Sequence, residues 1–348
     1  MDIICHDHSE GKLIYALDFL AYLNASSYEV NFSLSAQQLV DYRLLFRHLP
    51  NLKINENSSV QKDTVHIVFS DAPPVSEEPG QYNLVLPITT EKKKREWNTF
   101  TSERVVPLSE SGNPRHSVIV ADYLSACDML ERRMCGAPLK NKRLIVSAGP
   151  TAEDIDPVRF ITNRSSGKMG IAVARTAFQM GAEVRLVLGP TSEPVPLCLK
   201  TQRVRSAREM AEAVLSVFPQ YDAYIAAAAV ADFTPEQTAE HKIKKAEAGL
   251  TLRLMRTPDI LEGLKKRRPE QMVVGFSMET KNLLENSLLK LNKKNLDWIV
   301  ANNPTEPDAG FAADTNKVIL INRQGGKTEL PTASKLDIAR QLLEIIFE

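Results

Sequence analysis

The sequence predicts an α/β protein whose larger part is a mostly parallel sheet with helices on both faces. In residues 142–348, short runs rich in Val and Ile alternate with segments of helical periodicity. These runs are largely apolar, which is typical of parallel strands buried on both faces. A weaker alternation of the same kind in residues 1–140 predicts a smaller α/β domain before it.

The composition is that of a folded globular protein. The chain has 348 residues, of which 43% are hydrophobic and 25% charged, and this excludes collagen-like, disulfide-scaffold and largely disordered classes. The net charge is zero, so we expect neither nucleic acid nor a membrane as a partner. Residues 1–140 carry 14 basic against 18 acidic side chains and the remainder 29 against 25, a balance that suits a small anionic ligand.

Targeting signals and cysteine usage indicate the cytoplasm. No run of 18 apolar residues is present, and the first residues lack the apolar core of a signal peptide. Four cysteines lie at spacings that match neither a disulfide framework nor a zinc site. We therefore expect a reducing compartment and no transmembrane helix.

The first predicted domain, residues 1–140, combines four strands with three helices. Alternating or continuous apolar runs predict the strands, and capped segments of 3.6-residue periodicity predict the helices. The expected strands are 2–6, 28–34, 64–70 and 82–88, and the expected helices are 10–23, 35–49 and 117–134. The pattern breaks at CGAPLKN, so we place the domain boundary near residue 140.

The second predicted domain, residues 141–348, alternates more regularly. The expected strands are 143–149, 183–189, 222–230, 272–278, 297–302 and 317–322, and the expected helices are 167–181, 206–218, 257–267 and 279–295. In such doubly wound sheets, ligands bind at the carboxyl ends of the strands, beside glycine-rich turns.

One of these turns predicts an anion site. The first strand ends in SAGPT, a long polar loop follows, and a helix is expected to begin near Gly167. Ser165, Ser166 and Gly167 would expose main-chain N–H groups at the positive end of that helix. A phosphate cradle is one interpretation and a well-capped, closely packed helix is the other. The turn is neither a Walker loop nor a G-x-G-x-x-G fingerprint.

Six motifs follow one another in the second half of the chain, namely SAGPTAEDIDPVRFITNRSSGKMG, AAAAVADFTPEQTAEHKIKK, RTPDIL, VVGFSMET, KKNLDWIVANNP and GFAADTNKVILI. In this order they resemble the family of phosphopantothenoylcysteine synthetase, the ligase half of the bifunctional coenzyme A biosynthesis flavoprotein. The resemblance covers about residues 142–347. It implies a Rossmann-like fold, a homodimer and a ligase that forms an amide bond.

The resemblance also implies a two-step reaction. The carboxylate of 4′-phosphopantothenate attacks the α-phosphate of a nucleoside triphosphate, CTP or ATP with CTP favoured, and pyrophosphate leaves. The cysteine amine then attacks the acyl carbon, releasing the nucleoside monophosphate. Mg²⁺ on the phosphates is expected, and no FMN, because residues 1–140 lack the P-A-M-N-like turn of the flavin decarboxylase half.

Three residues match the family's catalytic positions. Asn163 matches an amide tied to turnover of the acyl-nucleotide, and Arg159 matches an arginine of the substrate site. Lys242, in HKIKK, matches a lysine that closes over the triphosphate. Each has a plainer interpretation, as a loop cap, a surface ion pair and a solvated basic loop respectively.

The remaining expected site residues also follow from the resemblance. Ala228 and Ala229, with Ser165, Ser166 and Gly167, are expected to bind substrate. The nucleotide is expected to contact Asp232, Lys242, Pro258, Asp259, Ile260, Leu261, Phe276, Lys290 and Lys294. Helix–sheet packing, turn formation, a helix start, a core position for Phe276 and plain surface charge are the alternatives at these positions.

Two other functions compete with the ligase. An NAD(P)-dependent oxidoreductase should have an acidic residue closing the second strand, but EVRLVLGPT ends in Gly-Pro-Thr. A non-catalytic relative of the ligase is the other candidate, although Asn163 and Lys242 are both present. The role of residues 1–140 stays open.

Overall fold

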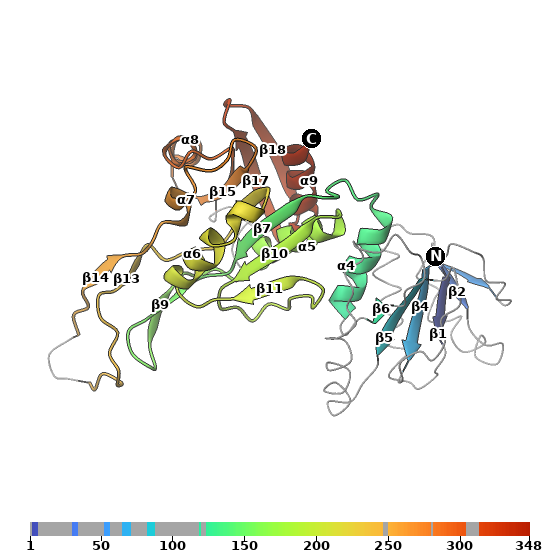
Figure 1. Ribbon diagram of the computed structural model, residues 1–348, viewed down its shortest axis with the longest axis horizontal. Coiled ribbons are helices and arrows are strands. Elements are labelled where there is room, and N and C mark those ends of the chain that lie inside the picture. The colour runs from blue at the N-terminus through green and yellow to red at the C-terminus, as the bar shows by residue number, and fades with distance from the viewer. Residues whose placement is uncertain are drawn as a thin grey trace. The chain divides into compact units, whose positions relative to one another are not determined.

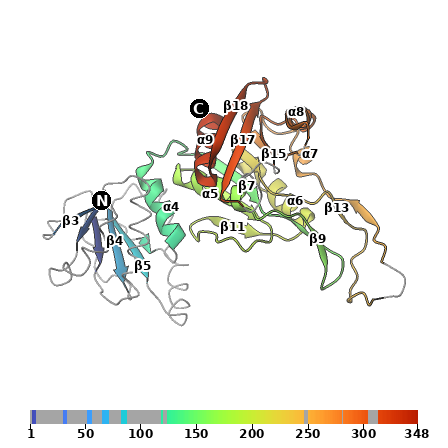
Figure 2. The ribbon, with the colours of Figure 1, turned by 180° about the vertical axis from the view of Figure 1, so that it is seen from behind.

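The computed structural model describes residues 123–245, 250–279, 281–303 and 313–348, together with six strands before them. The chain divides into two compact units (Figures 1 and 2). The first comprises Met1–Met129 with Pro196–Cys198, and the second comprises Leu130–Val195 with Leu199–Glu348.

The first unit contains a parallel six-stranded sheet with the order β3-β2-β1-β4-β5-β6. The strands are β1 (Asp2–Cys5), β2 (Val30–Ser33), β3 (Leu52–Asn55), β4 (Val65–Ser70), β5 (Tyr82–Pro87) and β6 (Val118–Ile119). The four predicted strands are confirmed and β3 is additional. The expected helix 117–134 is instead β6 followed by α4 (Tyr123–Met134). The helices expected at 10–23 and 35–49 lie outside the described residues.

The second unit is built on an eight-stranded sheet with the order β11-β10-β7-β12-β15-β16-β17-β18. Its strands are β7 (Arg143–Ala148), β10 (Glu183–Leu188), β11 (Lys200–Arg203), β12 (Ala223–Ala226), β15 (Met272–Met278), β16 (Trp298–Asn302), β17 (Thr315–Asn322) and β18 (Lys327–Ser334). The first six in this order are parallel, whereas β17 and β18 are antiparallel to their neighbours. The predicted mostly parallel sheet is therefore confirmed.

Helices cover both faces of this sheet. α5 (Lys168–Gln179) packs on β7, β10 and α9 (Lys335–Phe347). The other face, which presents Ile145 and Tyr224, is covered by α6 (Ala207–Leu215), the 3-10 turn η2 (Phe218–Gln220), α7 (Ile260–Gly263) and α8 (Leu283–Lys293). The helix expected over 257–267 is reduced to the single turn α7.

Two antiparallel ribbons project beyond the sheet where the sequence predicts only loops (Figure 1). One pairs β8 (Ala152–Asp154) with β9 (Phe160–Thr162), and the other pairs β13 (Phe233–Pro235) with β14 (Leu254–Arg256). Large apolar side chains are exposed on or beside these ribbons, namely Val158, Phe160, Phe233, Leu250, Leu254 and Met255.

Two glycines allow close main-chain contacts at the carboxyl ends of β7 and β10. A Cβ on Gly170 would lie 2.5 Å from the Cβ of Ala148, so α5 sits directly against β7. A Cβ on Gly189 would lie 1.8 Å from the carbonyl oxygen of Pro150. Here glycine lets two chain segments touch through their backbones.

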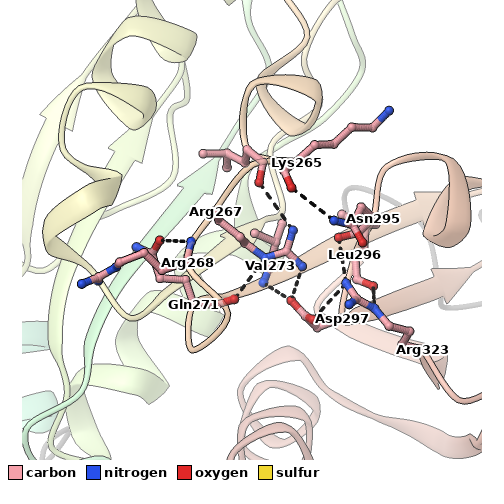
Figure 3. A network of polar contacts seen from close by, with 10 residues as sticks. Lys265, Arg267, Arg268, Gln271, Val273, Asn295, Leu296, Asp297 and Arg323 are labelled. Atoms are coloured by element: carbon pink, nitrogen blue, oxygen red, sulfur yellow. Dashed lines mark hydrogen bonds and ion pairs between the residues drawn. The ribbon is translucent and has the colours of Figure 1, made fainter.

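The opposite, amino edge of the sheet is joined by a polar network centred on Asp297 (Figure 3). One carboxylate oxygen of Asp297 accepts from Arg267 Nη2 at 2.6 Å and from the N–H of Val273 at 2.8 Å. The other oxygen pairs with Arg323 Nη2 at 3.1 Å. The network therefore links the beginnings of β15 and β16 to the end of β17.

Gln271 extends this network to the next connection. Its amide nitrogen donates to the carbonyls of Phe218 (2.9 Å) and Tyr221 (2.7 Å), and its amide oxygen accepts from the N–H of Arg268 (3.1 Å). Each of these partners is a main-chain group near a strand beginning, and the Phe218 carbonyl also accepts from the N–H of Tyr221 at 2.9 Å. None of the described helices is long and apolar enough to cross a bilayer.

Candidate functional site

A cavity of about 290 Å³ lies at the carboxyl ends of β12, β15 and β16 and beside the start of α5. The chain runs from β7 to β10 on one side of β7 and later returns to β12 on the other side. The cavity therefore lies at the point where the strand order reverses, which is where doubly wound sheets bind their ligands. Its lining residues are Ser165 to Gly170, Ala227 to Val230, Asp232, Phe276, Met278, Lys290, Asn302, Asn316 and Lys335.

The start of α5 forms one wall. Gly167 caps the helix with φ +86°, a left-handed conformation that favours glycine, and a Cβ there would lie 3.2 Å from the Cα of Gly149. The hydroxyls of Ser165 and Ser166 accept hydrogen bonds from the N–H groups of Gly167 (3.3 Å) and Lys168 (3.4 Å), both longer than the usual length of about 2.9–3.0 Å. The helix start thus lines the cavity, and its dipole favours an anion there.

The loop after β12 forms a second wall. Ala229 pairs with the loop after β7, donating to the Gly149 carbonyl at 2.9 Å and accepting from Thr151 at 3.3 Å. Ala228 and Asp232 both line the cavity. Among the described residues, the N–H of Ala228 has no hydrogen-bond acceptor, so it is available to a ligand.

Three lysines contribute positive charge to the lining. Lys290, on α8, donates to the Phe276 carbonyl at 2.7 Å, and its burial lowers the pKa of the ammonium. Lys168 pairs with Asp314 at 2.6 Å, and this hydrogen bond raises its pKa. Burial, followed by the nearby charge of Lys168, lowers the pKa of Lys335. A cavity with these lysines suits a ligand that carries phosphate groups.

The structure brings together eight of the predicted site residues on the cavity wall. They are Ser165, Ser166, Gly167, Ala228, Ala229, Asp232, Phe276 and Lys290. Three of them come from the helix start that sequence spacing singles out, and Ala228, Ala229 and Asp232 come from the loop after β12, which the resemblance assigns to the site. The two motifs meet as expected for a sheet of this topology.

Asn163 lies just behind this wall. Its side-chain amide donates to the carbonyls of Ala229 (3.0 Å) and Val230 (3.2 Å). Donation to an acyl oxyanion would therefore require one of these hydrogen bonds to be exchanged for the ligand.

Arg159 and Lys242 do not line the cavity. Arg159 forms an ion pair with the buried Asp156, at 2.5 Å between Nη2 and Oδ2, and also donates to the carbonyl of Ile243 at 2.8 Å. Lys242 is exposed. It precedes Ile243, whose N–H donates to Asp156 and so attaches this segment to the β8–β9 ribbon.

The residues expected at the turn 258–261 also lie away from the cavity lining. Asp259 caps α7 and pairs with Lys294, which likewise does not line the cavity. Ile260 is buried in the core, while Pro258 and Leu261 flank the turn. Lys290 and Lys294, predicted on one helix face, thus have different surroundings.

Several lining residues are absent from the sequence prediction. Asn302 ends an apolar strand with a polar side chain, a signal that could have identified it. Asn316 lies within a motif quoted for the resemblance but was not assigned to the site. Lys335 reaches the cavity only because β17 and β18 fold back to place the start of α9 there, and no local pattern reveals this. Residues 310–312, with which the motif GFAADTNKVILI begins, lie outside the described residues.

The fold and the cavity define an α/β protein of the class that binds a ligand at the switch point of a parallel sheet. A family model described as "DNA/pantothenate metabolism flavoprotein C-terminal domain" matches residues 139–348. The chain belongs to this family, and the predicted resemblance is confirmed.

Individual relatives agree with this assignment. The chain is 50% identical over 211 residues to the coenzyme A biosynthesis bifunctional protein CoaBC of Bacillus subtilis, covering 60% of this chain and 52% of the relative. The CoaBC protein of Escherichia coli K12 is 44% identical over 214 residues, with 60% and 52% covered. The chain therefore spans about half the length of these relatives.

A solved structure shares the fold. The crystal structure of the C-terminal domain of a coenzyme A biosynthesis bifunctional protein CoaBC superimposes with a TM-score of 0.52 at 41% identity. The match covers 61% of this chain and 96% of that domain. The likeness thus concerns the second unit, which contains the cavity.

Proposed function

We propose that the chain is a phosphopantothenate–cysteine ligase of coenzyme A biosynthesis, and that residues 141–348 form its ligase domain. The observation that carries the proposal is the cavity at the switch point, where the α5 start, the Ala228 N–H and Lys290 converge. The names and identities of the CoaBC relatives support it.

The proposed first step forms an acyl-nucleotide. The carboxylate oxygen of 4′-phosphopantothenate attacks the α-phosphorus of CTP or ATP, the bond to the bridging oxygen breaks, and pyrophosphate leaves. The helix start and Lys290 would stabilise the developing charge on the phosphates. Phe276 would lie against the nucleotide. We favour CTP, as the resemblance implies.

The proposed second step forms the amide. The cysteine amine attacks the acyl carbon, loses a proton, and the nucleoside monophosphate leaves with the electrons of the broken C–O bond. We expect the N–H of Ala228 and the amide of Asn163 to donate to the carbonyl oxygen as it becomes an oxyanion.

A magnesium ion fits the donors of this cavity. Asp232 is the acidic side chain among the described lining residues, and Mg²⁺ is usually held by one or two carboxylates together with phosphate oxygens. When bound, the ion would neutralise charge on the leaving pyrophosphate. Asp232, whose charge also acts on Lys290, would hold the ion together with the nucleotide's phosphates.

We further propose a homodimer in the cytoplasm. The exposed Phe160, Phe233 and Met255 on the two ribbons favour a second copy as the partner, because a cluster of large exposed apolar side chains commonly marks an interface. Sedimentation of the full chain would test the oligomeric state, and cell fractionation would test the location. That the chain binds no FMN stays a prediction.

The decisive experiment measures pyrophosphate release by the full chain with phosphopantothenate, cysteine and each of CTP, ATP, GTP and UTP. Release that requires phosphopantothenate, followed by formation of phosphopantothenoylcysteine, supports the ligase. Tight NADPH binding without pyrophosphate release would favour the oxidoreductase, and no turnover with any nucleotide would favour a non-catalytic relative.

Asn163→Ala separates the two steps. We expect pyrophosphate release in a single turnover to persist while the acyl-nucleotide accumulates, because only the second step loses one of its two expected oxyanion donors. Quenched-flow analysis of the bound intermediate measures this. Loss of the first step with normal nucleotide binding would contradict the role given to Asn163.

A further inference from the structure

The segment that carries Lys242 is attached to the β8–β9 ribbon by several hydrogen bonds. The hydroxyl of Thr238 donates to the Asp154 carbonyl at 3.0 Å, and the N–H of Ala239 donates to the Ile155 carbonyl at 2.9 Å. Further along, both main-chain groups of Ile243 are bound by the ribbon's turn. Lys242 therefore lies between fixed points at Ala239 and Ile243.

Asp156 is the centre of the attachment at Ile243. Its carboxylate is fully buried, and Oδ2 accepts from the N–H of Ile243 at 3.1 Å. The same oxygen accepts from Nε (3.0 Å) and Nη2 (2.5 Å) of Arg159, whose Nη2 also donates to the Ile243 carbonyl. A carboxylate and a guanidinium thus hold the N–H and the C=O of one residue.

The remaining contacts fix the carboxylate itself. Oδ1 of Asp156 accepts from the N–H groups of Val158 and Arg159, both at 2.8 Å. The hydrogen bond from the Arg159 guanidinium, reinforced by these N–H groups, holds the pKa of Asp156 far below its usual range. The carboxylate is therefore ionised whenever the chain is folded near neutral pH, and it has five donors and one orientation.

We infer that Asp156 is a positioning residue that acts through Ile243 and Arg159 to fix Lys242 relative to the phosphate-binding end of the sheet. Lys242 lies on a mostly exposed segment, and such a segment loses conformational entropy when it must present one charge to a ligand. Docking at Ile243 removes part of that loss before the nucleotide binds. The role of Lys242 in this inference rests on the proposed function, whereas the docking itself does not.

Asp156→Asn tests the docking directly. The amide keeps only one acceptor oxygen and removes the charge, so either Ile243 and the Arg159 guanidinium or the N–H groups of Val158 and Arg159 face a donor. The attachment is therefore weakened with almost no change in volume. Hydrogen–deuterium exchange of the full chain should become faster in peptides covering 238–245 and stay unchanged in peptides covering β7. Arg159→Lys keeps the positive charge but lacks the forked guanidinium that donates to both Asp156 and the Ile243 carbonyl, so it should show the same change in exchange. It replaces Asp156→Asn as the test if that variant fails to fold.

Asp154→Asn is the matched control. Asp154 lies on the same ribbon and pairs with Arg205 at 2.6 and 2.9 Å, yet its side chain makes no contact with the Lys242 segment among the described residues. We expect no change in the exchange of 238–245. Equal acceleration by both variants would show that the ribbon merely loosens and would overturn the inference.

Kinetics supply the second readout. Asp156→Asn should lower kcat/KM for the nucleotide by about tenfold or more while leaving KM for cysteine unchanged, since small displacements of a charged group have effects of this size. In a Lys242→Ala background the same substitution should have almost no further effect. Additive losses in the double variant, or an equal rise in both KM values, would overturn the inference.

The two proposals fail separately. If the wild-type chain turns over no nucleotide, the ligase proposal fails, and the exchange of 238–245 alone still decides whether Asp156 docks the segment. If the wild-type chain is active and Asp156→Asn leaves both the exchange and the kinetics unchanged, the positioning role fails while the ligase proposal stands.

Discussion

The two edges of the large sheet differ in how they use polar groups. At the amino edge, Asp297 joins Arg267, Arg323 and the N–H of Val273, so charged groups face partners of opposite sign (Figure 3). At the carboxyl edge, within the part of the chain that the structure describes, the partly buried Lys290 donates to a main-chain carbonyl, and an N–H of the alanine loop has no acceptor.

This difference separates stability from ligand binding. Buried polar groups lower stability unless they are paired, and a ligand that pairs them recovers the loss as affinity. The amino edge is complete without a ligand, whereas the carboxyl edge is complementary to an anion. Substitutions at the two edges should therefore change different measurements.

The largest effect is expected for Asp297→Ala. Removing the carboxylate leaves Arg267, whose side chain is only 7% exposed, without its ion pair, and also leaves the N–H of Val273 without an acceptor. We expect a loss of about 3 kcal/mol in the free energy of unfolding. Urea denaturation measures it, and KM for the nucleotide should not change. A shift in that KM without loss of stability would break the proposed separation.

Gly170→Ala should affect both measurements. The new Cβ would lie 2.5 Å from the Cβ of Ala148, so the start of α5 must move away from β7. We expect a loss of about 2 kcal/mol of stability, typical of overpacking, together with weaker nucleotide binding. Denaturation and isothermal titration calorimetry measure the two. Unchanged nucleotide affinity would show that the helix start is not part of the anion site.

Lys290→Met should affect binding alone. Methionine has a similar length and removes a buried charge, so we expect unchanged or slightly higher stability. Nucleotide affinity should fall about tenfold, as for loss of one charge-assisted contact, equivalent to about 1.4 kcal/mol. Lys293→Met, on the same helix but outside the cavity lining, is the control and should leave the affinity unchanged.

The smallest effect is a pH dependence that belongs to Lys290. Because burial lowers its pKa, the native chain loses this proton at a lower pH than the unfolded chain does. The unfolded state then binds more protons in that alkaline interval, so stability attributable to this group rises with pH. Nucleotide affinity should fall over the same interval, and Lys290→Met should abolish both changes. Denaturation and titrations between pH 8 and 10.5 test the sign.

Much of the fold follows from the sequence because buried parallel strands are recognisable locally. The runs at β7, β10, β15 and β16 are almost continuously apolar, and each is observed within a residue or two of its expected ends. The ribbons β8–β9 and β13–β14 are not predicted because their strands show little apolar alternation. In each ribbon the extended conformation depends on pairing between its own two strands. α9 is also missed, although Ser334 and Asp337 form a capping pattern at its start.

The candidate site is predictable only in part, for a topological reason. Residues of the α5 start and the β12 loop are close in any sheet that reverses its strand order at this point, so Gly167 and Ala228 can be expected to meet. Lys335 reaches the cavity through an antiparallel excursion whose geometry no short motif encodes. The contacts of Asp156 cannot be predicted from the neighbouring sequence, because its partner Ile243 lies 87 positions further along the chain.

The contact between Gly189 and Pro150 has a consequence for reading mutational scans of this protein. A single added carbon at position 189 would collide with a backbone oxygen, which cannot rotate away as a side chain can. A saturation library should therefore return this glycine among the least replaceable positions, although it does not line the cavity. Intolerance to substitution at Gly189 would reflect the close contact of two backbone segments and not a catalytic role. Variants scored for both folding and turnover would distinguish these two causes.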